Sequence, residues 1–183
     1  MAARFDNVMI IGMGLIGGSV AGALKAGDPH VRIYGLDIKG EVAVRALELG
    51  LADETPDRAE SISLLAGGEI DLVVLAAPVD AYGAWFDFIG ESGYDGVVTD
   101  TGSTKEPAIK LANEHLRKPD RFVPGHPMAG SEQEGIDGAR PDLFKNAYWI
   151  LTPGERTDIY AFRRLHELLT QIGARVLSID PAE

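Results

Sequence analysis

Residues 8–17 read Val8-Met9-Ile10-Ile11-Gly12-Met13-Gly14-Leu15-Ile16-Gly17, and this stretch decides the fold. Its first four residues are an unbroken apolar run, typical of a strand buried on both faces. The glycines that follow have the spacing Gly-x-Gly-x-x-Gly, and small residues then continue as a helix to about Gly27. At such a turn the first glycine permits a tight bend, the second lets a pyrophosphate approach the backbone, and the third lets the helix pack on the sheet. The stretch predicts a dinucleotide-binding strand–turn–helix unit.

An acidic residue supports this prediction. Asp37 ends the next expected strand, Val31–Leu36, twenty residues after Gly17. A carboxylate there can accept hydrogen bonds from the adenosine ribose and would repel a 2′-phosphate, which favours NAD over NADP. Lys39 leaves NADP open, because its ammonium could partly neutralise that phosphate. The expected cofactor-binding residues are Gly12, Gly14, Leu15, Ile16, Gly17, Asp37, Ala77, Pro78 and Ser103. For Ala77 and Pro78, ordinary core packing is the alternative, and for the glycines it is a turn without a ligand.

The order of strand, turn and helix repeats along the chain. Further strands are expected at Leu72–Ala76, Val97–Thr99, Phe122–Val123, Tyr148–Leu151 and Arg175–Ile179, and helices at Glu41–Leu49, Arg58–Leu65, Tyr82–Ile89, Lys105–His115 and Ile159–Ile172. Because the strands are apolar without alternation, we expect both of their faces to be covered. The fold class is therefore α/β, with a Rossmann-type, doubly wound, mostly parallel sheet.

Composition narrows the classes of function. The chain has 17 Lys+Arg against 28 Asp+Glu, and a net charge of −11 would repel nucleic acid and anionic membranes. It has no cysteine, which excludes disulfides and cysteine-bound metals, and we expect no metal site. The longest apolar run, Leu72–Val79, is too short to span a bilayer, and the first residues lack the layout of a signal peptide. We expect a cytoplasmic protein whose partner is a small molecule.

Two polar stretches follow later strands. Asp100-Thr101-Gly102-Ser103-Thr104-Lys105 begins where a strand hands over to a helix, so Ser103 and the first N–H groups of the helix could hold an anion, with Lys105 adding charge. The alternative is capping by Ser103 with Lys105 in solvent. His126 lies where the strand near Phe122–Val123 gives way to a glycine-rich loop. Ligands bind at the carboxyl edge of such sheets, which favours a functional His126 over a structural one.

Together, Gly12–Gly17, Asp37, the Asp100–Lys105 turn and above all Gly125-His126-Pro127-Met128-Ala129-Gly130-Ser131-Glu132 resemble the family of prephenate, arogenate and cyclohexadienyl dehydrogenases. The resemblance covers essentially the whole chain. It implies NAD-dependent oxidative decarboxylation of prephenate to 4-hydroxyphenylpyruvate in tyrosine biosynthesis. Arogenate, which has the same ring chemistry, is the alternative substrate.

The resemblance also implies a role for each residue of the site. His126 accepts a hydrogen bond from the ring hydroxyl of the substrate as hydride leaves the carbon that bears it. Its imidazole must be neutral for this, so activity should fall at acidic pH. Ser103 contacts both the substrate hydroxyl and the nicotinamide, and is catalytic together with His126. The implied substrate-binding residues are Ser103, Lys105, His126, Ser131 and Glu132, with Glu132 acting as a gate.

The last four residues, Asp180-Pro181-Ala182-Glu183, carry the capping signals of a helix start. We therefore expect an NAD-binding domain over residues 1–179 and the start of a further helical domain over residues 180–183, with a frayed tail as the alternative. The resemblance implies that the further domain forms a homodimer and supplies an arginine for a substrate carboxylate.

Two other functions stay open. One is a different dehydrogenase of the same build, such as a 3-hydroxy acid dehydrogenase or an imino-acid reductase, which would place a lysine or another catalytic group on a later helix. The other is a nucleotide-binding module without catalysis, which needs Gly12–Gly17 and Asp37 but not His126.

Overall fold

A computed structural model describes residues 4–179, and its larger sheet is the parallel one that the sequence predicts. The sheet has five parallel strands in the order β2-β1-β3-β4-β5. These strands are β1 (Asn7–Ile11), β2 (Arg32–Leu36), β3 (Leu72–Leu75), β4 (Val97–Asp100) and β5 (Phe122–Val123). The chain moves outward from β1 to β2 and then returns to the other side of β1 for β3. The carboxyl ends of β1 and β3 therefore frame the switch point at which such sheets bind ligands.

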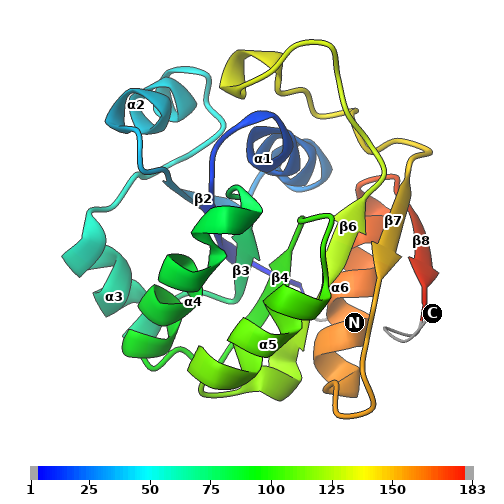
Figure 1. Cartoon of the computed structure of the whole chain (residues 1–183). Coiled ribbons are helices and arrows are strands. Elements are labelled where there is room, and N and C mark those ends of the chain that lie inside the picture. The colour runs from blue at the N-terminus through cyan, green and yellow to red at the C-terminus, as the bar shows by residue number, and fades with distance from the viewer. Residues whose placement is uncertain (1–3, 180–183) are drawn as a thin grey trace.

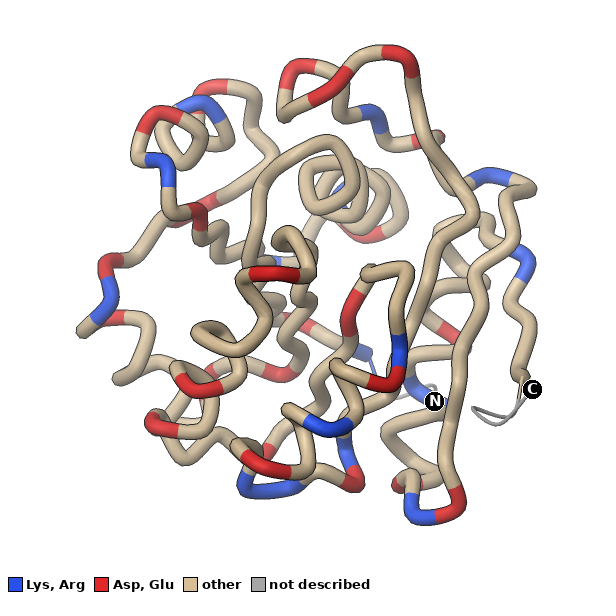
Figure 2. Tube along the Cα trace, viewed as in Figure 1, with Lys and Arg blue, Asp and Glu red and all other residues tan. Residues whose placement is uncertain are grey.

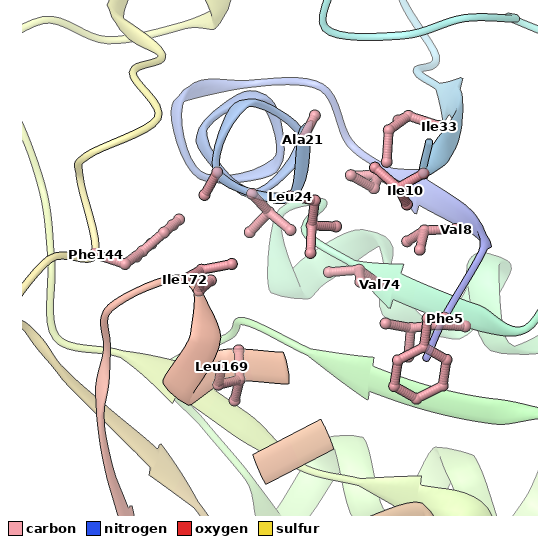
Figure 3. Close-up of a cluster of buried hydrophobic side chains, with 14 of the residues drawn as sticks. Phe5, Val8, Ile10, Ala21, Leu24, Ile33, Val74, Phe144, Leu169 and Ile172 are labelled. Atoms are coloured by element: carbon pink, nitrogen blue, oxygen red, sulfur yellow. The ribbon is translucent and has the colours of Figure 1, made fainter. Parts of the chain in front are cut away.

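Helices cover both faces of this sheet (Figure 1). One layer contains α1 (Leu15–Gly27), α2 (Gly40–Glu48) and α6 (Ile159–Gln171), and the other contains α3 (Arg58–Ala66), α4 (Tyr82–Glu91) and α5 (Glu106–His115). Alternate residues of a strand face opposite layers, so Val8 packs toward α1 and α6 while Met9 packs toward α3, α4 and α5. Figure 3 shows Leu24 of α1 near Ile172, at the end of α6, on the first of these faces. The predicted α/β class is confirmed.

The last three strands form a second sheet, which corrects the expectation of one sheet and of His126 beyond the end of a strand. β6 (Gly125–Pro127), β7 (Tyr148–Leu151) and β8 (Arg175–Ser178) pair in that order. β6 runs antiparallel to β7, and β8 runs parallel to it. Pro124 lies between β5 and β6, where the chain leaves the first sheet, and His126 is the central residue of β6. Trp149 and Leu151 of the second sheet are buried in the same core as α1, so the two sheets share one interior.

Residues 4–179 also contain three short 3₁₀ helices: η1 (Val79–Ala81), η2 (Pro119–Arg121) and η3 (Ile136–Gly138). η3 belongs to the loop between β6 and β7, where Ile136 is buried in the core. The Arg140 N–H donates to Ser19 Oγ at 3.0 Å, and Arg45 of α2 pairs with Asp137 at 2.9 Å. The middle of this loop is thus held against α1 and α2.

Acidic residues are spread over most elements of the described chain and do not gather on one side (Figure 2). No helix within residues 4–179 is long and apolar enough to cross a membrane. The expected helix start at residues 180–183 lies outside the described residues.

Candidate functional site

The glycine turn after β1 is packed tightly against the backbone of neighbouring segments. Gly12 has a φ of +93°, and its N–H donates to the Leu36 carbonyl at 2.7 Å. A Cβ at Gly12 would lie 2.6 Å from the Ala77 nitrogen, so the loops after β1 and β3 touch here. A Cβ at Gly17 would overlap the Gly12 carbonyl oxygen. The fold itself therefore requires glycine at positions 12 and 17.

Gly14 is different, because nothing in the described protein occupies the space beside it. A Cβ at Gly14 would have no heavy atom within 4 Å. Gly14 is the N-cap residue of α1, and the first turn of that helix, which includes Leu15 and Ile16, has no acidic residue. The N–H groups of a first turn have no partner within their helix and attract anions. Open space beside unpaired donors fits a phosphate-containing ligand.

Asp37 is held in place at the end of β2. Its Oδ2 accepts the Met13 N–H and its Oδ1 accepts the Lys39 N–H, each at 2.9 Å. A carboxylate has about four acceptor positions, so two remain for a ligand. Ile38, next to it, is 78% exposed and presents an apolar surface that sequence reasoning did not single out. Lys39 is exposed, and Ala77 and Pro78 are half-buried and exposed at the end of β3.

Asp100, at the end of β4, is fully buried and accepts four hydrogen bonds. Its Oδ2 accepts from Tyr82 Oη at 3.0 Å, the Gly102 N–H at 3.2 Å and Lys105 Nζ at 2.6 Å. Its Oδ1 accepts the Gly125 N–H at 3.0 Å. Lys105 Nζ also donates to the Gly125 carbonyl oxygen at 2.5 Å. Asp100 thus joins α4, the start of α5 and β6.

These contacts overturn the alternative in which Lys105 lies in solvent, because the side chain is only 15% exposed and is ion-paired. A contact between Lys105 and an anionic substrate stays a prediction, and the charge of the lysine is already compensated by Asp100. Burial lowers the pKa of the Lys105 ammonium, and the Asp100 carboxylate acts in the opposite direction. Burial also raises the pKa of the Tyr82 hydroxyl far above its ordinary value, and Asp100 adds to this.

Capping by Ser103 is also wrong. Helix α5 begins at Glu106 and its N-cap residue is Lys105, with no side-chain cap. Ser103 lies exposed on the turn before the helix. Its hydroxyl therefore has room for an external partner.

His126 lies beside this turn. Its Nδ1 is 3.5 Å from the Thr101 carbonyl oxygen, and its side chain is half-buried. In the tautomer with the proton on Nδ1, the ring donates toward that carbonyl and the lone pair of Nε2 is free to accept a hydrogen bond. The structure therefore brings together His126, Lys105 and the turn that carries Ser103.

Ser131 and Glu132 are exposed on the loop that follows β6. Ser131 Oγ accepts the Gln133 N–H at 3.2 Å, which is a local contact. No contact described for residues 4–179 joins either side chain to His126, so their substrate-binding roles stay predictions. Within the same residues there is no cluster of three or more His, Asp or Glu side chains that could hold a metal ion.

Sequence reasoning missed Tyr82 as part of this site and treated Asp100 only as the first residue of a turn. The signal for Asp100 was present, because a carboxylate directly follows the apolar residues of an expected buried strand. A buried carboxylate needs partners, which predicts a cation nearby. No comparable signal marks Tyr82, whose hydroxyl meets Asp100 only in the folded chain.

The sequence of this chain is similar to those of known proteins. Residues 20–178 match the family described as "Prephenate dehydrogenase, nucleotide-binding domain". Prephenate dehydrogenase of Bacillus subtilis is 41% identical over 181 residues, covering 97% of this chain and 47% of that protein. Cyclohexadienyl dehydrogenase of Zymomonas mobilis is 36% identical over 174 residues, covering 94% and 57%. The chain thus spans about half the length of these curated relatives.

A solved structure is similar over the whole chain. It is prephenate dehydrogenase from A. aeolicus in complex with hydroxyphenyl propionate and NAD+, with a TM-score of 0.89 and 30% identity. The match covers 100% of this chain and 62% of that one.

The contrast between the glycines can be tested by stability. Gly17→Ala should lower the free energy of unfolding by about 1–3 kcal/mol, because its Cβ would overlap backbone that cannot rotate away. Gly14→Ala should lower it by no more than about 1 kcal/mol, since the site is open and only the preference of an N-cap position for glycine over alanine is lost. Urea unfolding of the two variants measures both values. Equal losses would mean that the space beside Gly14 is closed in solution.

Proposed function

The chain belongs to the prephenate dehydrogenase family, and we propose that residues 1–179 are the NAD-binding domain of an enzyme that oxidatively decarboxylates prephenate to 4-hydroxyphenylpyruvate. One observation carries this proposal. Along the carboxyl edge of the sheet, β2-β1-β3-β4, the chain places Asp37, the open turn at Gly14, Ala77 and the Ser103 turn in that order, and His126 lies beside the last. This order matches an extended dinucleotide with its ribose at Asp37 and its reactive end near His126.

The residues present fit NAD. The open space at Gly14 and the first N–H groups of α1 suit a pyrophosphate. The fixed carboxylate of Asp37 suits the ribose hydroxyls, and exposed Ile38 offers an apolar surface to the adenine. NAD supplies the acceptor for the hydride that leaves the substrate.

In this proposal His126 accepts the proton of the substrate's ring hydroxyl. Its Nε2 accepts a hydrogen bond from the ring hydroxyl of the substrate and takes the proton as the C–H bond at that carbon gives up its hydride. The bond to the ring carboxylate then breaks, its electron pair enters the ring, and carbon dioxide leaves. The proton returns to the oxygen, which becomes the phenol of the product. In this proposal Ser103, on the turn beside His126, holds the same hydroxyl.

Arogenate is the second candidate substrate. Its ring is the same and its side chain carries an amino group in place of the keto group, so His126 and Ser103 would act on it in the same way. The curated relatives include a cyclohexadienyl dehydrogenase as well as prephenate dehydrogenases.

Other parts of the proposal concern the full-length protein. Because Lys105 is paired with Asp100, the positive charge that holds the substrate carboxylates must come from elsewhere, and we assign it to the part of the relatives' length that this chain does not cover. We assign homodimer formation to the same part. The net charge of −11 supports a small-molecule partner and not nucleic acid, and a biosynthetic reaction of this kind supports a cytoplasmic location.

The Asp37 assignment predicts a cofactor preference. NAD should bind more tightly than NADP, because the Asp37 carboxylate would repel a 2′-phosphate. Asp37→Asn should weaken NAD binding about tenfold or more through loss of a charge-assisted hydrogen bond, and should narrow the difference between the two cofactors. Isothermal titration calorimetry measures both. Asp95→Asn, at an exposed position in the turn before β4, removes the same charge and should leave both affinities unchanged. Tighter binding of NADP would contradict the assignment.

The His126 assignment predicts a loss of turnover. His126→Asn in the full-length protein should lower kcat by about 10²-fold or more while NAD binding and thermal unfolding stay as in the wild type. Steady-state formation of NADH measures the rate. His30→Asn, at an exposed turn, is the matched control and should have wild-type turnover. An undiminished rate in His126→Asn would remove His126 from the reaction.

A further inference from the structure

β6, the strand that carries His126, is an edge strand. On the side away from β7, the backbone groups of Gly125 bind two side chains. β6 is the first strand of the order β6-β7-β8. On one side, the Pro124 carbonyl accepts the Thr152 N–H, and the Met128 N–H donates to the Tyr148 carbonyl. In an antiparallel ladder the backbone groups of alternate residues point to opposite sides, so those of Gly125 point away from β7. They meet Asp100 Oδ1 and Lys105 Nζ, at 3.0 and 2.5 Å.

The approach is close enough to require glycine at position 125. A Cβ there would lie 2.8 Å from both the Asp100 carbonyl oxygen and Trp149 Nε1. The absence of a side chain lets β6 come against the end of β4. Asp100 can then accept the Gly125 N–H, and Lys105 can donate to the Gly125 carbonyl oxygen.

The ion pair has little capacity left for a ligand. Asp100 accepts four hydrogen bonds, which is about the number that a carboxylate can accept. Lys105 Nζ uses two of its three N–H groups on Asp100 and Gly125. Its charge is compensated by a carboxylate at 2.6 Å. An anionic substrate would therefore gain little from this lysine.

The same pair closes the turn beside His126. Asp100 and Lys105 are the first and last residues of the segment that contains Thr101 and Ser103. Their contact brings the ends of this segment together, and the Thr101 carbonyl then lies 3.5 Å from His126 Nδ1. One ion pair therefore fixes both the backbone before His126 and the turn that carries Ser103.

We propose that Lys105 and Asp100 are positioning residues that set His126 against the Ser103 turn, and that Lys105 does not bind the substrate. This inference rests on the proposed function, in which His126 and Ser103 meet the reacting hydroxyl. A displacement of about 1 Å in such a site can cost up to about a hundredfold in rate.

Steady-state kinetics of Lys105→Met in the full-length protein test the proposal. Because His126 loses its placement, kcat should fall about tenfold to a hundredfold. The KM for the substrate and the Kd for NAD should stay within about threefold of wild type, because no contact to either is removed. Lys110→Met, on the exposed side of the same helix, is the matched control and should not change kcat. A rise in KM with kcat unchanged would overturn the proposal in favour of a substrate-binding lysine.

A double variant separates positioning from folding. Lys105→Met alone leaves a buried carboxylate without its cation, which destabilises the fold. In Asp100→Asn/Lys105→Met neither charge remains, so thermal stability should recover toward wild type. The turnover should stay low, because the hydrogen bond from position 105 to the Gly125 carbonyl is still missing. Recovery of both stability and kcat would show that the pair has only a structural role.

A readout without substrate distinguishes failure of this inference from failure of the proposed function. In protein labelled with ¹⁵N-histidine, the His126 ring signals are identified by their loss in His126→Asn. Lys105→Met should shift these signals, since the ring loses its place beside the Thr101 carbonyl, and Lys110→Met should not. If the wild type oxidises neither prephenate nor arogenate, the proposed function fails while this measurement still applies. Unchanged His126 signals in Lys105→Met would overturn the positioning role.

Discussion

Asp100 carries a charge at the end of β4 where no solvent reaches it, and the structure around it follows from the need to compensate that charge. A buried carboxylate is tolerated only when it is paired and fully hydrogen-bonded. Lys105 supplies the cation, and Tyr82, Gly102 and Gly125 supply the remaining donors. These donors come from α4, the turn after β4 and β6. Satisfying one carboxylate thus brings together segments that are distant in the chain, and His126 lies next to one of them.

The glycine turn after β1 combines close packing at two of its glycines with open space at the third. Gly12 and Gly17 let the loops after β1 and β3 and the start of α1 crowd together without side chains between them. The described protein leaves open space beside Gly14, at the N-terminus of α1, where the first N–H groups have no partner within the helix. Close packing on one side and open space on the other are what a phosphate-binding turn needs.

Much of the fold could be predicted from the sequence because the strands are short, apolar and separated by clear glycine turns. β1, β2 and α1 lie close to where residues 8–27 and 31–36 place them. The division into two sheets could not be predicted, because an apolar run such as Tyr148–Leu151 says that it is buried but not which strands it joins. Pro124 was the local signal that the chain turns between β5 and β6, and its effect depends on the partners that β6 then finds.

Part of the candidate site could be predicted, because several of its residues follow a recognisable spacing. Motif spacing identified Gly12, Gly14, Gly17 and Asp37, which lie on one edge of the sheet as expected. The place of Asp100 after a buried strand predicts that it needs a cation, but the sequence does not say that Lys105 supplies it, because the two side chains meet only in the folded chain. The roles of Ser131 and Glu132 remain predictions from resemblance.

The most direct test of the catalytic assignment is the stoichiometry of the reaction in the full-length protein with NAD and either prephenate or arogenate. We expect one NADH and one carbon dioxide for each substrate molecule consumed, with 4-hydroxyphenylpyruvate formed from prephenate or tyrosine formed from arogenate. Reduction of NAD without release of carbon dioxide, or no reduction with either substrate, would contradict it.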